Sequence, residues 1–161
     1  MKALTILAAL LLCVVALSCS SSKKSLEADV PLTPYTKFYR LDGSTMIYDE
    51  LKGKTAAILF WAAWCNFSKR AVRHFNDEAK RFQGRSDVVF LAVSIDDDRA
   101  LLLQRIGQDK LNSVTHVFSG NGPDDEAYLA FKVREIPAAV LVKPSGDIMQ
   151  QGSRIDLSEV R

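Results

Sequence analysis

Apolar and polar residues alternate along most of the chain in patterns that predict strands and helices in turn. Residues 37–41 and 45–48 alternate on either side of Asp42-Gly43, a dipeptide typical of hairpin turns. Residues 55–61 form an almost continuous apolar run, as expected of a strand buried on both faces of a sheet, and residues 88–95 form another. The pattern therefore predicts an N-terminal β-hairpin followed by a buried sheet.

The segments that follow have helical periodicity or turn signals. Residues 66–82 place charged side chains around a helix with one apolar stripe. That stripe consists of Phe67, Ala71, Phe75, Ala79 and Phe82. The other predicted elements are a helix opened by Asp96, Asp97 and Asp98 that stops near Gly107, a strand over 113–118, a helix over 124–131, and a hairpin of 138–142 and 148–151. Alternating strands and helices closed by a hairpin predict an α/β fold with a mixed sheet.

Composition excludes several classes of protein. The 161 residues carry 21 basic against 19 acidic side chains, a net charge of +2, so no large basic field for nucleic acid is present. Apolar residues at 48% and charged residues at 25% are typical of a globular protein and exclude disorder, collagen and coiled coil. Three cysteines are too few for a small domain held together by disulfides. We expect one domain.

The N-terminus has the pattern of a leader. A basic start is followed by the apolar residues 3–17, a stretch too short to span a membrane comfortably, so residues 1–18 are predicted to be a signal peptide. Residues 16–19 resemble a lipobox whose Cys19 receives the lipid, although Ala16 stands where leucine is usual. Two interpretations stay open, a lipid-anchored protein of the bacterial cell envelope and a secreted soluble one.

The same interpretation divides the chain and leaves one thiol. Residues 19–36 would hold the lipid-attachment cysteine and a flexible tether, and residues 37–161 the domain. Cys13 would leave with the leader and Cys19 would carry the lipid, so Cys65 has no partner for an intramolecular disulfide.

Cys65 is the candidate nucleophile because it falls where a buried strand ends and a helix begins. A thiol there faces unpaired backbone N–H groups and the positive end of the helix, which favour the thiolate. Lys69, Arg70, Arg73 and His74 follow in the first turns and add positive potential. The alternative for a lone cysteine is an unreactive small apolar side chain.

This constellation resembles the thioredoxin superfamily, and most closely its membrane-tethered TlpA/ResA-like branch. The resemblance covers about residues 39–159. Its motifs are Leu51-Lys-Gly-Lys54, Phe60-Trp-Ala-x-Trp-Cys65, Val93-Ser-Ile-Asp96, Phe131-Lys-Val-Arg-Glu-Ile-Pro137 and Pro144-Ser-Gly146. It implies a thioredoxin-like fold, in which helices flank the central mixed β-sheet and the N-terminal β-hairpin is added.

The resemblance also implies the roles of three further residues. Pro137 would be cis and pack beside the active sulfur, the backbone of Ile136 would pair with the substrate, and Trp64 would lie at the rim of the site. The alternative for Pro137 is an ordinary proline at the start of a strand.

Departures from the family pattern define the expected chemistry. Ser68 replaces the second cysteine, Leu59 the buried carboxylate of thioredoxins, Ala71 the glutamate of TlpA/ResA-like proteins, and Arg73 the kink proline. Ser68 either hydrogen-bonds the thiolate or serves as an ordinary first-turn serine. Without a second thiol, a mixed disulfide at Cys65 must be resolved by an external thiol reductant.

Two functions follow as hypotheses. The first is a monothiol thiol–disulfide exchange protein of isomerase or reductase type, acting outside the cytoplasm on protein thiols and disulfides, with Cys65 and Ser68 catalytic. The second is a redox-inactive module that binds an extended peptide around Trp64 and Ile136.

Other features are given less weight. Asp96, Asp97 and Asp98 are interpreted as the acidic start of a helix, and His74 and His116 lack partners at zinc-ligand spacing, so no metal and no cofactor are expected. Residues 66–68 match a glycosylation sequon at a poor acceptor position. Residues 156–161 resemble the first turn of the family's closing helix, and a partner-supplied helix, a bare sheet face or a truncated sequence all stay open.

Overall fold

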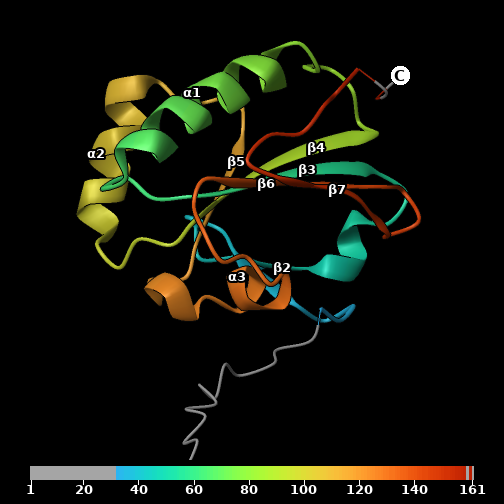
Figure 1. The fold of residues 1–161 in the computed structure, drawn as a ribbon, viewed down its shortest axis with the longest axis horizontal. Coiled ribbons are helices and arrows are strands. Elements are labelled where there is room, and N and C mark those ends of the chain that lie inside the picture. The colour runs from blue at the N-terminus through green and yellow to red at the C-terminus, as the bar shows by residue number, and fades with distance from the viewer. Residues whose placement is uncertain (1–31, 159, 161) are drawn as a thin grey trace, which may run out of the picture.

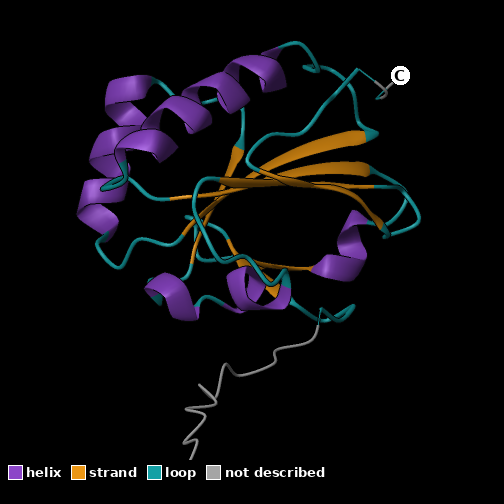
Figure 2. Cartoon of the chain, viewed as in Figure 1, coloured by secondary structure: helices purple, strands orange, loops and turns teal. Residues whose placement is uncertain are grey.

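The computed structural model describes residues 32–158 and 160. A five-stranded sheet in the order β5-β4-β3-β6-β7 forms its centre, and a separate hairpin pairs β1 with β2 (Figure 1, Figure 2). The strands are β1 (Lys37–Tyr39), β2 (Thr45–Ile47), β3 (Thr55–Trp61), β4 (Val88–Ser94), β5 (Thr115–Phe118), β6 (Ala138–Val142) and β7 (Ile148–Gly152), and the helices are η1 (Tyr48–Leu51), α1 (Asn66–Lys80), α2 (Arg99–Asp109), η2 (Gly122–Asp124) and α3 (Glu126–Ala130). The predicted mixed sheet is confirmed, since β3, β4 and β5 run parallel while β6 is antiparallel to both β3 and β7.

Strand β3 lies at the middle of the sheet and supplies side chains to both of its faces. Ala56, Ile58 and Phe60 belong to one buried cluster, while Leu59 and Trp61 belong to the other. This division follows from the two-residue period of a strand, whose successive side chains point to opposite faces. The run is apolar throughout because both faces are covered.

Different elements cover the two faces (Figure 1). Helices α1 and α2 pack on one face, where Val72, Phe75 and Leu102 meet the sheet. The β1–β2 hairpin and α3 pack on the other, where Phe38 and Phe131 have ring centroids 6.4 Å apart. The predicted hairpin is confirmed, and it covers this second core and joins the central sheet through one isolated antiparallel bridge between Arg40 and Val117.

Helix ends differ from the sequence prediction where local polar groups decide them. Helix α2 begins after its N-cap Asp98, whose carboxylate accepts from the N–H groups of Ala100 and Leu101 at 2.8 and 3.1 Å. It passes through Gly107, the predicted stop, and ends at Lys110, which adopts the left-handed conformation with φ of 51°. Asp125 caps α3 by accepting from Tyr128 at 2.9 Å, so this helix starts later than predicted.

The predicted apolar stripe of α1 is wrong at its N-terminal end. Phe67 is 67% exposed and Ala71 only partly buried. The side chains that this helix buries are Ser68, Val72, Phe75, Asn76 and Ala79. Relative to the prediction, the helix is rotated about its axis, so that Ser68 faces the core and Phe67 faces solvent.

The C-terminal segment forms no helix within the described residues. A single turn brings the N–H of Val160 to within 3.1 Å of the carbonyl of Leu157, and Ile155 and Leu157 pack against the core beside α1. Of the helical turn expected over 156–161, the described part therefore contains one hydrogen-bonded turn that does not continue as a helix. The predicted signal peptide and Cys19 lie outside the described residues. Over residues 32–158 and 160, no helix combines the length and the apolar character that crossing a membrane requires.

Removing core volume from the central sheet should test this packing. Leu91 in β4 is fully buried, so Leu91→Ala should lower the free energy of unfolding by about 2–5 kcal/mol in urea titrations. The matched control is Leu103→Ala in α2, because Leu103 is 40% exposed and its truncation should cost less than about 1 kcal/mol. Equal losses for both variants would contradict the described core.

Candidate active site

The turn between β3 and α1 places Cys65 at the start of the helix. Ala62, Ala63 and Trp64 lead out of the strand, and the N–H of Cys65 donates to the carbonyl of Ala62 at 3.2 Å. Cys65 is the N-cap of α1, with an extended backbone, and its carbonyl accepts from the N–H of Lys69 at 3.1 Å. The predicted position of the thiol is thus the observed one, with the sulfur partly exposed at the mouth of the turn.

A buried carboxylate anchors this turn. Both oxygens of Asp96, which is fully buried, accept from the backbone N–H of Ala63 at 3.0 and 2.9 Å. The hydroxyl of Ser94 donates to the same carboxylate at 2.6 Å and accepts from the N–H of Asp96 at 3.1 Å. The prediction that Asp96 belongs to the acidic start of α2 is therefore wrong, because that role falls to Asp98 and Asp96 instead ties the end of β4 to the turn that carries Cys65.

Polar groups of the first helical turn act on the thiol. Burial raises the pKa of Cys65, but the hydroxyl and N–H of Ser68, the N–H of Phe67 and the charge of Lys69 lower it, and the net pKa lies below the ordinary value of a cysteine. The first turn of α1 contains no acidic side chain that would oppose this effect. These groups therefore shift the equilibrium of Cys65 toward the thiolate, which is the nucleophilic form of cysteine.

Ser68 lies one turn into α1 with a fully buried side chain. Its Oγ has no hydrogen-bond partner of good geometry among residues 32–158 and 160. A buried hydroxyl in this condition costs free energy unless it finds an acceptor. A thiolate at Cys65 supplies one, and this agrees with the lowering of the Cys65 pKa by the Ser68 hydroxyl.

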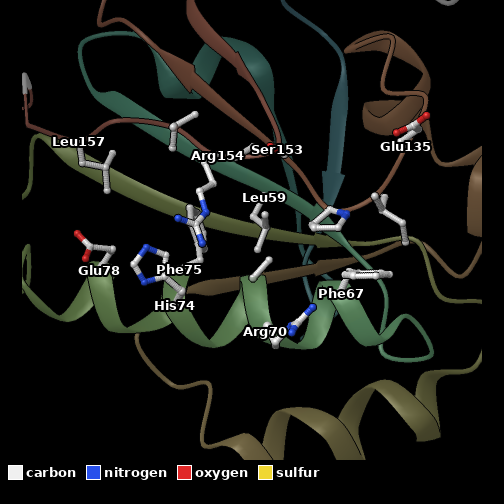
Figure 3. A pocket seen from close by; sticks show the side chains of 15 residues that line it. Leu59, Phe67, Arg70, His74, Phe75, Glu78, Glu135, Ser153, Arg154 and Leu157 are labelled. Atoms are coloured by element: carbon white, nitrogen blue, oxygen red, sulfur yellow. The ribbon is translucent and has the colours of Figure 1, made fainter.

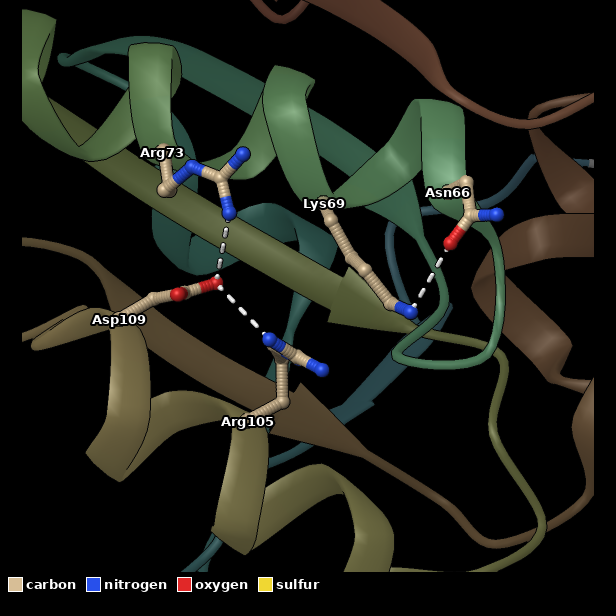
Figure 4. Close-up of polar contacts among 5 residues, drawn as sticks. All are labelled: Asn66, Lys69, Arg73, Arg105 and Asp109. Carbon is tan, nitrogen blue, oxygen red and sulfur yellow. Dashed lines mark hydrogen bonds and ion pairs between the residues drawn. The ribbon is translucent and has the colours of Figure 1, made fainter.

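Two of the basic residues that follow Cys65, Lys69 and Arg73, have polar partners of their own (Figure 4). Lys69 lies closest along the chain, and its ammonium donates to the side-chain carbonyl of Asn66 at 3.1 Å. Arg73 turns instead to α2, where Asp109 accepts from it at 3.3 Å and lies 3.7 Å from Arg105. Of the four basic residues singled out in the sequence, Arg73 therefore serves the packing of α1 on α2.

The Ile136–Pro137 peptide bond is cis, as the resemblance implied. In the antiparallel register of β3 and β6, Phe60 faces Ala138, so Pro137 lies beside the end of β3 from which the Cys65 turn departs. Cys65 and Ile136 both pack against the core cluster on the hairpin side of the sheet. The backbone of Ile136 precedes the ladder of β6 and has no hydrogen-bond partner within the described part of the chain.

A groove with a volume of about 560 Å³ opens beside these residues, on the α1 side of the sheet (Figure 3). Its floor includes Leu59, which is 2% exposed at the position where thioredoxins carry a buried acid. Ala71 lines the wall formed by α1. Leu59 and Ala71, two of the departures from the family pattern, therefore contribute apolar surface to one groove, which we call the α1 groove.

The two tryptophans differ in exposure, and Asp96 has a contact that the sequence did not indicate. Trp64 is 55% exposed, as a rim residue should be, whereas Trp61 is fully buried. Asp96 was missed as an anchor, because three consecutive aspartates before a helix give no sign of which one turns inward. The described residues hold no group of three or more histidine, cysteine or acidic side chains placed to bind a metal.

Replacing Ser68 should change the ionisation of Cys65 without disturbing its position. Ser68→Ala removes a hydrogen bond to the thiolate, so the pKa of Cys65 should rise and iodoacetamide should alkylate the thiol about tenfold more slowly at neutral pH. The pH dependence of alkylation measures both quantities. Ser86→Ala, at an exposed serine beyond the far end of α1, is the control that should leave the midpoint almost unchanged. A Ser68→Ala midpoint equal to that of the wild type would assign the hydroxyl no role.

Removing the carboxylate of Asp96 should destabilise the turn. Asp96→Ala leaves the buried N–H of Ala63 without an acceptor, so the free energy of unfolding should fall by about 1–3 kcal/mol. Asp97→Ala is the matched control, since Asp97 is exposed and its removal should change stability by less than about 0.5 kcal/mol. Chemical denaturation of the two variants makes the comparison.

Comparison with known proteins agrees with this geometry. Over 109 residues the chain is 28% identical to the thiol-disulfide oxidoreductase ResA of Oceanobacillus iheyensis, a match that covers 67% of this chain and about half, 54%, of the relative's length. Among solved structures, a thiol-disulfide oxidoreductase from Bacteroides fragilis superposes with a TM-score of 0.69 at 20% identity, covering 79% of this chain and 93% of the other. A secreted Mycobacterium tuberculosis disulfide oxidoreductase homologous to E. coli DsbE gives 0.61 at 20% identity, covering 75% and 84%.

These structures confirm the predicted thioredoxin-like fold, and the ResA match agrees with the branch that the motifs indicated. A family model described as thioredoxin-like matches residues 53–148, which is more than half of the chain and includes both Cys65 and Pro137. The chain therefore belongs to the thioredoxin-like family.

Proposed function

We propose that the protein is a monothiol thiol–disulfide exchange enzyme in which Cys65 is the nucleophile. The observation that carries this proposal is the partly exposed thiol at the N-cap of α1, whose pKa is lowered by Ser68 and its neighbours. The ResA protein of O. iheyensis is a thiol-disulfide oxidoreductase and the M. tuberculosis protein a disulfide oxidoreductase, which is the same class of activity. Trp64, Ile136 and Pro137 would form the rim against which the substrate lies.

The exchange requires two partners in succession. The Cys65 thiolate attacks one sulfur of a substrate disulfide, a Cys65–substrate disulfide forms, and the other substrate sulfur leaves as a thiolate with the electron pair of the broken bond. A second thiol then attacks this mixed disulfide and releases the Cys65 thiolate. If that thiol belongs to the substrate, the net reaction is isomerisation. If it belongs to an external reductant, the substrate sulfur becomes joined to that reductant, and a second reductant thiol must then displace it, so that the substrate leaves as a thiol and the two reductant thiols leave as a disulfide.

Ser68 makes the external step necessary. A cysteine at this position would attack the sulfur of Cys65, form an internal disulfide with it and release the substrate as a thiolate, whereas a hydroxyl cannot. Its role in the proposal is to donate a hydrogen bond to the thiolate, both before attack and when Cys65 leaves. Ser68 is therefore proposed as a catalytic residue that stabilises charge.

The proposal includes a location outside the cytoplasm. It rests on the leader-like residues 1–18 and on the lipobox-like sequence before Cys19, which suggest attachment to the membrane of a bacterial cell envelope through a lipid. The M. tuberculosis relative is described as secreted, which fits a protein of the same class acting in an oxidising compartment. Secretion without a lipid anchor is the alternative.

A redox-inactive binding module is the second candidate. It is favoured by the apolar residues Leu59 and Ala71, which supply no proton acceptor near the thiol, and by the unpaired backbone of Ile136, which can pair with an extended peptide. In that case Trp64 and Ile136 would bind a partner, and the thiol would have no part in it.

Activity on scrambled ribonuclease in a glutathione buffer tests the exchange function. Cys65→Ser should abolish isomerisation, because the oxygen nucleophile forms no mixed disulfide. Ser68→Cys should allow the protein to reduce disulfides with a dithiol such as dithiothreitol as the electron source, since an internal disulfide becomes available at the matching position. Wild-type activity no higher than that of Cys65→Ser would contradict the proposal.

Capture of partners from envelope extracts separates the two candidates. Partners that the wild type retains only in non-reducing gels, and that Cys65→Ser does not retain, indicate exchange. Equal recovery by both proteins indicates binding without chemistry.

A further inference from the structure

The α1 groove carries positive charge close to the proposed nucleophile. Arg70 rises from α1 with its guanidinium 5.3 Å from the centre of the Phe67 ring, and Arg154 reaches from the segment after β7 toward α1 near His74 and Phe75 (Figure 3). The two guanidinium groups thus come from opposite walls of the groove. Both side chains are exposed to solvent.

The acidic residues along this groove do not neutralise these charges. Glu78 is engaged by Arg81 at 2.8 Å, and Glu135 lies at the other end, beyond Arg70 and Phe67 (Figure 3). No carboxylate forms an ion pair with Arg70 or Arg154 among residues 32–158 and 160. The groove therefore combines an apolar floor with two cations that have charge available for a ligand.

One end of the α1 groove lies near Cys65. Phe67, Ile136 and Pro137 line the groove at the end nearest the thiol. Arg70 follows Cys65 by five residues, a rise of about 7.5 Å along the helix. An extended peptide advances about 3.3 Å per residue, so a carboxylate two or three residues from a bound cysteine reaches the guanidinium.

We propose that the α1 groove selects acidic peptide disulfides, with Arg70 and Arg154 as specificity-determining residues that hold a carboxylate near the cysteine under attack. The proposal rests on the exchange function assigned to Cys65 and names its substrate class. The apolar part of the peptide lies on Phe67 and Pro137, and the charge is held by the two arginines. Each guanidinium acts as a donor for a carboxylate oxygen.

Two synthetic peptides test this preference on the full chain. Each carries a central cysteine as a mixed disulfide with 2-thiopyridine, flanked on both sides by glycine and then by glutamates in one peptide and glutamines in the other. Release of thiopyridone gives the rate constant for attack by Cys65. The wild type should react about two- to tenfold faster with the glutamate peptide, and added salt should reduce the difference, because the contacts are exposed.

Variants assign the preference to the groove. In Arg70→Gln/Arg154→Gln the ratio of the two rate constants should fall to about one. The ratio cancels any change in the ionisation of Cys65, since that change affects both peptides equally. Arg73→Gln also removes a positive charge from α1. Because Arg73 pairs with Asp109 and does not line the groove, this variant should keep the wild-type ratio. A ratio that is equal in the wild type and the double variant would overturn the proposal.

A binding measurement distinguishes failure of this proposal from failure of the exchange function. Fluorescence anisotropy with the same two peptides, each containing serine in place of cysteine, needs no reaction at Cys65. Tighter binding of the glutamate peptide that is lost in the double variant supports the groove even if neither disulfide reacts. The absence of any preference in both measurements refutes it.

Discussion

The candidate active site depends on the hydrogen bonds between the carboxylate of Asp96 and the backbone of Ala63. Strand β3 ends at Trp61, and the carbonyl of that residue accepts from Ile95 at 2.9 Å, so the two parallel strands leave the sheet together. Asp96 then holds the departing chain in a tight turn. Because α1 starts directly after this turn, the carboxylate fixes where the helix begins and which residue caps it.

Placing Cys65 at that cap gives the thiol its chemical character. The end of a parallel strand meets the start of a helix here, so backbone N–H groups without helical partners converge on one side chain. The hydroxyl of Ser68 adds a hydrogen-bond donor for the sulfur, and Lys69 adds positive charge. The reactivity of the thiol is thus a property of chain geometry as much as of its neighbours' side chains.

Most of the fold could be predicted from the sequence because it follows from short-range patterns. The apolar run of β3 has the same bounds in the prediction and in the structure, and the hairpin about Asp42-Gly43 forms as expected. Helix ends were less predictable, since the end of α2 depends on a left-handed Lys110 rather than on Gly107. A non-glycine residue in that conformation has no signature in the sequence.

The site was predictable where family motifs carry it and unpredictable where distant segments meet. Cys65 and the cis Ile136–Pro137 bond follow from motifs, whereas the inward turn of Asp96 depends on a backbone N–H from another strand. The rotation of α1 that buries Ser68 and exposes Phe67 was not predicted either. Alanine, serine and phenylalanine in this helix are compatible with two apolar stripes that differ by one position. The α1 groove is formed by three separate segments, and no local pattern marks it.

Leu59 has a consequence for the partners of this protein. With a leucine on the sheet and an alanine on the helix, the core around the thiol contains no group at those two positions that takes up a proton from an incoming thiol. In the proposed exchange, that proton would have to pass to solvent or to a side chain outside these two positions. Turnover of the mixed disulfide would therefore depend on the acidity of the surrounding medium and would favour resolving partners whose own thiols are acidic.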